Sequence, residues 1–145
     1  MRALKGTTSV WREQPMLTLK IAGRPPDLHQ QGKHRMVKAA ITRDRRAMVK
    51  VLAQGERHRA GLDPCPDEIR RLHVTLYWIG TKRDSPNVLQ DLKADVDALV
   101  DAGWLFNDDD NHLLIDYPPS YEVAASKSLM AVEYQLFEED GWGYQ

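Results

Sequence analysis

Hydrophobic and polar positions alternate with a period of two in parts of this chain, which is typical of strands. Residues 16–23, MLTLKIAG, alternate apolar and polar side chains, and residues 72–80, LHVTLYWIG, are rich in β-branched and aromatic side chains. Two later apolar runs, HLLIDY at 112–117 and SLMAVEYQLF at 128–137, have the same character. These four runs predict four strands.

Two other segments repeat their apolar residues at helical spacing. Between residues 35 and 54 the apolar positions are Met36, Val37, Ala40, Ile41, Met48, Val51 and Leu52. This spacing predicts a helix with one apolar stripe and a strongly basic opposite face. A second helix is predicted from Pro86 to Asp101, because Pro86 suits a first turn and Gly103 suits the position just past a helix end.

The predicted order of elements is therefore β-α-β-α-β-β. It indicates an α+β fold, in which two main helices pack on one mixed β-sheet of about four strands. The 145 residues are enough for one domain with a real core. We place that domain at residues 16–137, with a loose N-terminal arm at 1–15 and a loose tail at 138–145.

Composition predicts a cytoplasmic protein without a membrane partner. Apolar residues make up 42% of the chain and charged residues 28%, and no apolar run approaches the roughly 18 residues that span a bilayer. The first residues, MRALKGTTSVWREQP, lack the apolar region of a secretory signal. Cys65 is the only cysteine, so no internal disulfide can form.

Charge is divided unequally between the two halves of the chain. Residues 1–72 carry 16 Lys and Arg against 7 Asp and Glu, whereas residues 73–145 carry 4 against 14. The balances of +9 and −10 give the net charge of −1. Such asymmetry points to nucleic-acid contact by the basic half, or equally to two halves that fold together and neutralise each other.

The first predicted helix is a candidate phosphate-binding surface, although a solvated basic face would look the same in sequence. No aromatic residues interleave its cations, so contact with DNA would be mostly to the backbone and sensitive to salt. The candidate DNA-binding residues, including two that precede the second helix, are Lys33, Arg35, Lys38, Arg43, Arg45, Arg46, Lys82 and Arg83.

Carboxylates flank the second predicted helix on both sides. Asp84 lies where a strand feeds this helix, so it either favours the positive helix end or holds a hard cation through oxygen. Asp108, Asp109 and Asp110 are three adjacent carboxylates in a loop without a basic residue. A solvated loop tolerates their repulsion, and bound Mg²⁺ or Mn²⁺ would relieve it and supply metal-assisted phosphodiester cleavage.

Lys93 is the only cation within the second helix, and four aspartates of the same helix surround it in sequence. One interpretation is an ordinary surface ion pair of small energetic value. The other is a cation that steadies a phosphate, or the charge that develops during cleavage.

The spacing of residues 83–109 is more specific than composition. It reads Arg83-Asp84-Ser85-Pro86-Asn87-Val88, Leu92-Lys93, Asp97-Ala98-Leu99, Ala102-Gly103 and Asp108-Asp109. This pattern resembles the RusA family of Holliday-junction resolvases, whose hallmark is RD-x-D-N-L, a lysine on the helix, DAL or DGL, AG and a short step to DD. The upstream segments LTLKIAGRPPDL and KAAITRDRRA are also similar to that family, so the resemblance covers roughly residues 16–137.

The resemblance implies a magnesium-dependent, structure-selective endodeoxyribonuclease that resolves four-way DNA junctions by paired nicks. It also implies a homodimer in a bacterial host cell, in a phage or prophage context, with Mn²⁺ as a possible substitute metal. In the family three aspartates bind magnesium and a lysine assists cleavage. By position Asp84 matches the first aspartate, Lys93 the lysine and Asp108 the third aspartate, with Asp109 as the alternative third ligand.

Pro86 departs from the family pattern, because the second aspartate belongs at its position and proline cannot bind a metal. Either a neighbour such as Asn87 or a carboxylate of the triplet compensates, or the protein binds branched DNA and cuts it poorly. A third class of function is an interaction domain whose acidic patch binds a protein partner.

Geometry raises a question about the shared metal. A straight helix over residues 86–101 would be about 24 Å long. It would place Asp84 and Asp108 at opposite ends within one chain. They could share a metal if the chain bends back, or if a second subunit supplies one of them. A two-fold dimer with this helix antiparallel to its copy would bring the unlike ends together.

Overall fold

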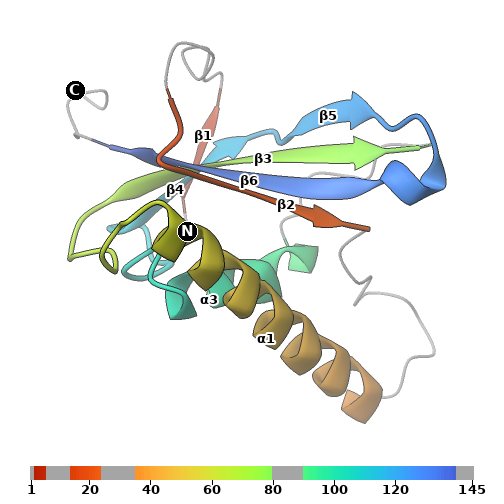
Figure 1. Ribbon diagram of the computed structural model, residues 1–145, viewed down its shortest axis with the longest axis horizontal. Coiled ribbons are helices and arrows are strands. Elements are labelled where there is room, and N and C mark those ends of the chain that lie inside the picture. The colour runs from red at the N-terminus through yellow and green to blue at the C-terminus, as the bar shows by residue number, and fades with distance from the viewer. Residues whose placement is uncertain (1, 6–13, 24–34, 80–89, 140–145) are drawn as a thin grey trace.

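The computed structural model describes residues 2–5, 14–23, 35–79 and 90–139 (Figure 1). These residues contain a mixed sheet of six strands in the order β1-β4-β3-β6-β2, with β5 paired to β3. The strands are β1 Arg2–Lys5, β2 Leu17–Ala22, β3 Arg70–Trp78, β4 Leu113–Tyr117, β5 Ser120–Val123 and β6 Ala131–Glu138. Strand β6 is antiparallel to both of its neighbours, whereas β4 and β5 run parallel to β3.

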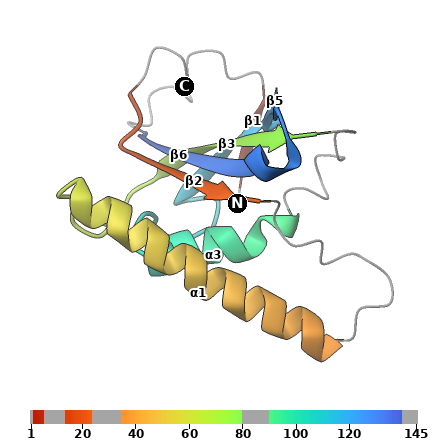
Figure 2. The ribbon, with the colours of Figure 1, turned by 45° about the vertical axis from the view of Figure 1, so that its right-hand side comes forward.

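Two helices, α1 Arg35–Arg59 and α3 Lys93–Asp101, cover one face of this sheet (Figures 1 and 2). A short 3₁₀ helix, η2 Lys127–Leu129, precedes β6. The core follows the strand alternation, since Leu72, Val74 and Leu76 of β3 are buried in the cluster that the helices cover. Their neighbours Arg71 and His73 therefore belong to the opposite face of the sheet.

The predicted fold class is confirmed: the protein is α+β, with two main helices on one mixed sheet in the predicted order. The structure adds two short strands that the sequence pattern did not reveal. Strand β1 lies within the segment predicted as a loose arm, and it is ordered by parallel pairing with β4. Strand β5, of four residues, pairs with β3 and not with its sequence neighbour β4.

Element boundaries moved by a few residues. Helix α1 continues to Arg59, five residues past the predicted end, and β6 begins at Ala131 because residues 127–129 form the 3₁₀ turn. The predicted start of the second helix at Pro86 lies outside the described residues, and α3 begins at Lys93.

The orientation of α1 reverses the prediction. The residues that pack against the rest of the domain are Arg45, Val49 and Ala53, whereas five of the predicted stripe residues are exposed. Those exposed residues are Met36, Val37, Met48, Val51 and Leu52. Polar contacts fix this orientation, because Arg45 binds Asp95 of α3 and the Trp104 indole donates to the Ala53 carbonyl at 2.8 Å.

Among the residues that the structure describes, neither helix has the length and apolar composition needed to cross a membrane.

Candidate functional site

Helix α3 ends in a Schellman motif that reverses the direction of the chain. Gly103 adopts a φ of 82°, and its N–H donates to the carbonyl of Val100 at 3.1 Å. The N–H of Trp104 donates to the carbonyl of Leu99 at 3.0 Å, and both of these side chains are fully buried. Glycine suits this position because it reaches the left-handed region without a steric penalty. The loop after Gly103 is thereby directed back along α3.

Lys93 and Asp108 meet in space although they are 15 residues apart in sequence. The Lys93 ammonium donates to Asp108 Oδ2 and also to Asp97 Oδ1, the latter at 2.8 Å. Of the two arrangements left open by the sequence, the chain bends back after the helix, since Asp108 contacts Lys93, the first residue of α3. The Schellman reversal at Gly103 is the physical reason.

The Lys93 ammonium is open to solvent, and the two carboxylates that it contacts are partly exposed. Lys93 has a side-chain exposure of 53%, and those of Asp97 and Asp108 are 29% and 28%. Partial burial opposes the charge on Lys93, but hydrogen bonds to Asp108 and Asp97 outweigh it and raise the pKa of Lys93. The hydrogen bond from Lys93 lowers the pKa of Asp108 in return.

Asp109 is engaged differently from Asp108. Its Oδ1 accepts from the N–H of Asn111 at 3.0 Å and contacts His112 Nδ1 at 2.5 Å. The other imidazole nitrogen of His112 contacts Asp67 Oδ1 at 2.6 Å. Hydrogen bonds to Asp67 and then to Asp109 raise the pKa of His112. Asp109 thus stabilises the loop, and Asp108 is the carboxylate of the triplet that contacts Lys93.

The described part of the site offers two carboxylates to a cation. Over residues 2–5, 14–23, 35–79 and 90–139, no three His, Cys, Asp or Glu side chains lie close enough to hold a metal ion together. The first predicted ligand, Asp84, lies outside the described residues. Asp97 and Asp108, which flank Lys93, have the hard oxygen donors that Mg²⁺ prefers.

The packing of α3 also bears on the predicted helix pair across a dimer. Its residues Ala94, Val96, Ala98 and Leu99 are buried by the rest of its own chain. The residues of α3 that reach the surface, Lys93 among them, are mostly charged. Helix α3 therefore presents no apolar face to a second copy of itself.

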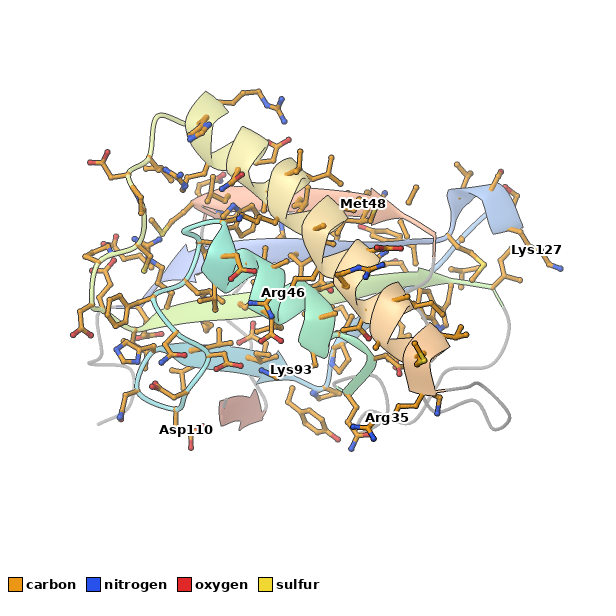
Figure 3. All side chains as sticks on the ribbon, turned by 90° about the horizontal axis from the view of Figure 1, so that it is seen from below. Arg35, Arg46, Met48, Lys93, Asp110 and Lys127 are labelled. Carbon is orange, nitrogen blue, oxygen red and sulfur yellow. The ribbon has the colours of Figure 1, made fainter. Side chains whose placement is uncertain are left out.

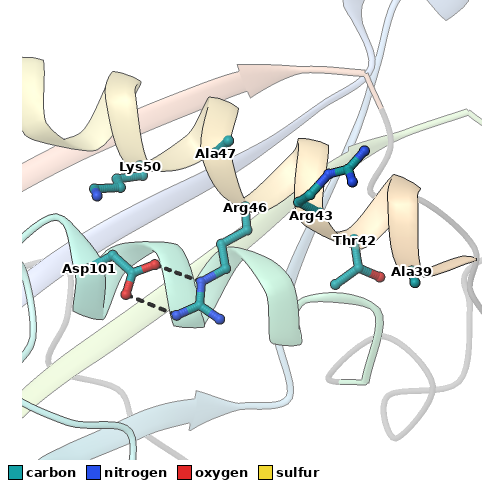
Figure 4. A pocket seen from close by; sticks show the side chains of 7 residues that line it. All are labelled: Ala39, Thr42, Arg43, Arg46, Ala47, Lys50 and Asp101. Atoms are coloured by element: carbon teal, nitrogen blue, oxygen red, sulfur yellow. Dashed lines mark hydrogen bonds and ion pairs between the residues drawn. The ribbon is translucent and has the colours of Figure 1, made fainter.

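Two of the predicted DNA-binding cations form ion pairs with aspartates of α3. The prediction that Arg45 contacts phosphate is corrected by its burial. The Arg45 side chain is 8% exposed and forms a bidentate pair with Asp95 at 2.7 and 2.9 Å. Arg46 is partly exposed and binds both oxygens of Asp101, which lowers the pKa of Asp101 (Figures 3 and 4). These contacts hold α1 against α3.

The remaining predicted cations fall into two groups. Arg35 and Arg43 are exposed on α1, and Lys38 on the same helix is partly exposed. Arg43 lines the shallow pocket between α1 and α3 together with Thr42 (Figure 4). Lys33, Lys82 and Arg83 lie outside the described residues.

Several ion pairs join the basic first half of the chain to the acidic second half. They are Arg45–Asp95, Arg46–Asp101 and Arg71–Asp116. Part of the charge asymmetry is therefore neutralised within the fold. Only the cations that remain exposed are still candidates for DNA contact.

Sequence reasoning missed two polar groups. Asp97 contacts Lys93 across one helical turn, and the i,i+4 spacing was a readable signal for it. On the opposite face of the sheet, His73 Nδ1 contacts Asp116 at 2.9 Å and His73 Nε2 contacts Ser120 Oγ at 2.8 Å. This second group joins β3, β4 and β5, and no sequence spacing indicates it.

Comparison with known proteins does not indicate a function for this chain. No model of a known protein family matches the chain, and no curated protein is similar enough to count as a relative.

Proposed function

We propose that this protein is a magnesium-dependent, structure-selective endodeoxyribonuclease that resolves four-way DNA junctions by paired nicks, with Mn²⁺ as a substitute metal. The observation that carries the proposal is the contact between Lys93 and Asp108. The resemblance assigns these two residues to one site from sequence alone, and folding brings them together across 15 positions. A solvated aspartate loop would not require that contact.

The proposed metal ligands are Asp84 and Asp108, and Asp97 is the third carboxylate. Asp97 takes the place of the aspartate that Pro86 cannot supply, because it already lies 2.8 Å from the Lys93 ammonium. A divalent ion bound here would lower the pKa of a coordinated water and neutralise charge on the scissile phosphate. Asp109 supports the loop by its contacts with His112 and binds no metal.

Lys93 provides the positive charge for the phosphate. Its raised pKa keeps it as an ammonium at neutral pH, the form that donates hydrogen bonds to phosphate oxygens. Its two carboxylate partners hold the ammonium in place before DNA arrives. Such a preorganised cation stabilises the negative charge that develops as the phosphodiester bond breaks.

The exposed cations of α1 would bind the DNA backbone. Arg35, Lys38 and Arg43 remain at the surface or partly so after Arg45 and Arg46 are used by α3. Contacts of this kind position the substrate without reading its sequence. Lys33, Lys82 and Arg83 remain predicted DNA-binding residues.

The second candidate is a branched-DNA-binding protein that cuts poorly. Pro86 favours it, because one of the three family carboxylates is replaced. The two candidates share the basic surface of α1 and differ in whether Asp97 completes the metal site.

The test is cleavage of a labelled four-way junction with Mg²⁺ or Mn²⁺ by the wild type, Asp108→Asn, Asp97→Asn and Lys93→Gln. Paired nicks should fall by about 100-fold or more in each variant, as for the loss of one preorganised electrostatic group. Asp110→Asn is the matched control, since Asp110 is an exposed neighbour in the same loop and should keep wild-type nicking (Figure 3).

The outcomes separate the candidates. Wild-type nicking that survives Asp108→Asn would refute the proposed site. Absence of nicking together with salt-sensitive junction binding would establish the non-cutting DNA binder. Absence of both would favour the interaction domain. Arg43→Gln should weaken junction binding, whereas Lys127→Gln, on η2 far from α1, should not (Figure 3).

A further inference from the structure

Three side chains on the face of the sheet opposite the helices are hydrogen-bonded in series. His73 Nδ1 lies 2.9 Å from Asp116 Oδ2, and His73 Nε2 lies 2.8 Å from Ser120 Oγ. The three residues come from β3, β4 and β5, so three separate strands hold them in place (Figure 1). A carboxylate and a serine joined through the two different nitrogens of one histidine form the arrangement that activates a serine hydroxyl in hydrolytic enzymes.

The direction of each hydrogen bond follows from the chemistry of the carboxylate. Because a carboxylate only accepts, the Nδ1–H of His73 donates to Asp116. In the neutral imidazole the other nitrogen, Nε2, then carries the lone pair, and the hydroxyl of Ser120 donates its proton to it. The guanidinium of Arg71 donates to the same Asp116 oxygen at 2.9 Å, which fixes the position of the carboxylate behind the ring.

The group is buried at its acidic end and more open at the serine. The side chains of Asp116 and Arg71 are 3% and 4% exposed, and that of His73 is 12% exposed. Ser120 is partly exposed at the start of β5. This order suits a nucleophile, because a substrate has to reach the serine while the carboxylate and the ring are held in fixed positions behind it.

Stability of the sheet does not account for these contacts. Strands β4 and β5 are already joined to β3 by backbone pairing, so the sheet does not need the side chains to hold it together. A structural network would also satisfy each buried oxygen. Among the described residues, Asp116 Oδ1 is buried and accepts no hydrogen bond, since Arg71 and His73 both donate to Oδ2. The contacts are arranged around the ring of His73 and not around the carboxylate.

We propose that Ser120 is a nucleophile that hydrolyses small, uncharged carboxylic esters, with His73 as its general base. Asp116 is the positioning residue that sets the tautomer and orientation of the ring. The substrate is small because Ser120 is only partly exposed, and it is uncharged because the cation of the group, Arg71, is already paired with Asp116. This inference does not depend on the proposed function, since the helix that carries Lys93 lies on the other face of the sheet (Figures 1 and 2).

The reaction needs only the ester and water. The oxygen of Ser120 adds to the ester carbonyl carbon as the hydroxyl proton passes to His73 Nε2. The bond from that carbon to the leaving alcohol breaks as Nε2 delivers the proton to the alcohol oxygen, which leaves an acyl-serine. Water then adds to the acyl carbon and gives its proton to Nε2, and Ser120 recovers that proton as the acid is released.

Thr75 is placed to stabilise the oxyanion that forms in both steps. It pairs with Ser120 in the register of β3 and β5, and the side chains of paired residues share one face of a sheet. Its hydroxyl is therefore a donor for the carbonyl oxygen as negative charge develops there. Thr75→Val removes this donor and keeps the branched shape of the side chain.

The first test is covalent labelling of the full chain by a fluorophosphonate in EDTA, followed by peptide mass spectrometry. An activated serine displaces fluoride from phosphorus, whereas an ordinary surface serine does not. Ser120 should be labelled in the wild type, and its labelling rate should fall by about 100-fold or more in His73→Ala. Ser128, which is exposed on η2, is the matched control within the same chain and should stay unlabelled.

The second test is the release of nitrophenol from p-nitrophenyl acetate, again in EDTA. Ser120→Ala should lower kcat/KM by about 100-fold or more, whereas Ser128→Ala should keep the wild-type value. Because free imidazole groups hydrolyse this ester weakly, Ser120→Ala also defines the background. Added imidazole should restore part of the activity of His73→Ala and none of that of Ser120→Ala, a rescue that a structural role of the ring would not give.

Two more variants test the supporting groups. Asp116→Asn should lower kcat with little change in KM, because an amide donates to the ring and favours the wrong tautomer. Thr75→Val should lower kcat by about 100-fold, as for the loss of one oxyanion donor. Circular dichroism of each variant separates these effects from unfolding.

Each result decides the proposal. Labelling of Ser120 that requires His73, together with turnover that Ser120→Ala removes, would establish it. An unlabelled Ser120 would overturn the nucleophile, and turnover that survives Ser120→Ala would do the same. Labelling without release of nitrophenol would overturn the hydrolysis of esters. All of these readouts are taken without DNA and without free metal, so failure of the proposed nuclease function leaves them intact.

Discussion

The Arg45–Asp95 pair should be a major determinant of stability. The guanidinium donates two hydrogen bonds to Asp95, at 2.7 and 2.9 Å, and the two side chains are 8% and 0% exposed. The hydroxyl of Tyr134, itself fully buried, also donates to Asp95. Burial, followed by the charge of Asp95, raises the pKa of Tyr134 well above its usual range, so the phenol remains a donor. All polar contacts in this group are thus made inside the protein.

Breaking the pair leaves a buried charge without its partner, which costs about 3–5 kcal/mol. We therefore expect Arg45→Met and Asp95→Asn each to lower the free energy of unfolding by about that amount. With a urea m-value of about 2 kcal/mol/M, the midpoint should fall by about 2 M. The double variant Arg45→Met/Asp95→Leu should recover most of the loss, because neither charge remains to be desolvated.

Urea unfolding at pH 7, followed by circular dichroism, measures the midpoint and the free energy of unfolding of each variant. Arg46→Met is the matched control, because Arg46 makes the same bidentate contact one position along the helix but is 47% exposed. It should cost about 1 kcal/mol or less. If the midpoint of Arg45→Met stayed within about 0.3 M of the wild type, the buried pair would not hold α1 to α3. Arg45 would then return to the candidate DNA-binding residues.

Three further predictions concern other contacts. The pKa of Asp101 is lowered by its hydrogen bond to Arg46, so Asp101→Asn should lower stability at pH 7 by up to about 1 kcal/mol. The difference should vanish in acid, as pH falls through the folded pKa. The pKa of His112 is raised by its flanking carboxylates, so the wild type should lose stability as pH rises above about 6.5, and His112→Gln should flatten that dependence in thermal melts. Gly103→Ala should lower the free energy of unfolding by about 2 kcal/mol in urea, because residue 103 has a left-handed φ. Gly55→Ala should raise the free energy of unfolding by about 0.5–1 kcal/mol, because Gly55 lies inside α1 and an added Cβ meets no close contact.

The elements with strong local patterns were predictable from sequence. Strands β2, β3, β4 and β6 each carry enough apolar residues to be recognised, and their order fixed the fold class. Strand β1 could not be found, because its four residues, RALK, have no pattern of their own and depend on pairing with β4. Local propensity is a weak guide wherever long-range pairing decides the structure.

The orientation of α1 was predicted wrongly for a physical reason. A hydrophobic stripe normally faces the core, so Val37, Met48 and Val51 were expected inside. Here the bidentate bonds of Arg45 to Asp95, 50 residues away, outweigh the stripe. Periodicity reports which face is apolar, but it does not report which partner covers that face.

The sequence indicated which residues belong to the candidate site, but it did not indicate how the chain brings them together. The resemblance assigned Lys93 and Asp108 to one site, and Gly103 was expected just past the end of the helix, where the structure has it. Helix length placed Asp108 at the far end unless the chain bends back, and the structure shows that bend as the Schellman motif at Gly103, which the sequence did not specify. The choice between Asp108 and Asp109 as a metal ligand stays a prediction; the structure shows that Asp108 contacts Lys93 and that Asp109 contacts His112.

The cations of α1 differ in role according to the face of the helix on which they lie. Arg45 and Arg46 face α3 and are neutralised there, so they add cohesion and little external field. Arg43 is exposed and pairs with Asp44, its neighbour in sequence, so its charge remains at the surface. Arg35, the first residue of the helix, is also exposed. The basic character of α1 therefore does not amount to one DNA-binding face, and phosphate contact should be concentrated at the exposed cations Arg35, Lys38 and Arg43, which α3 does not neutralise.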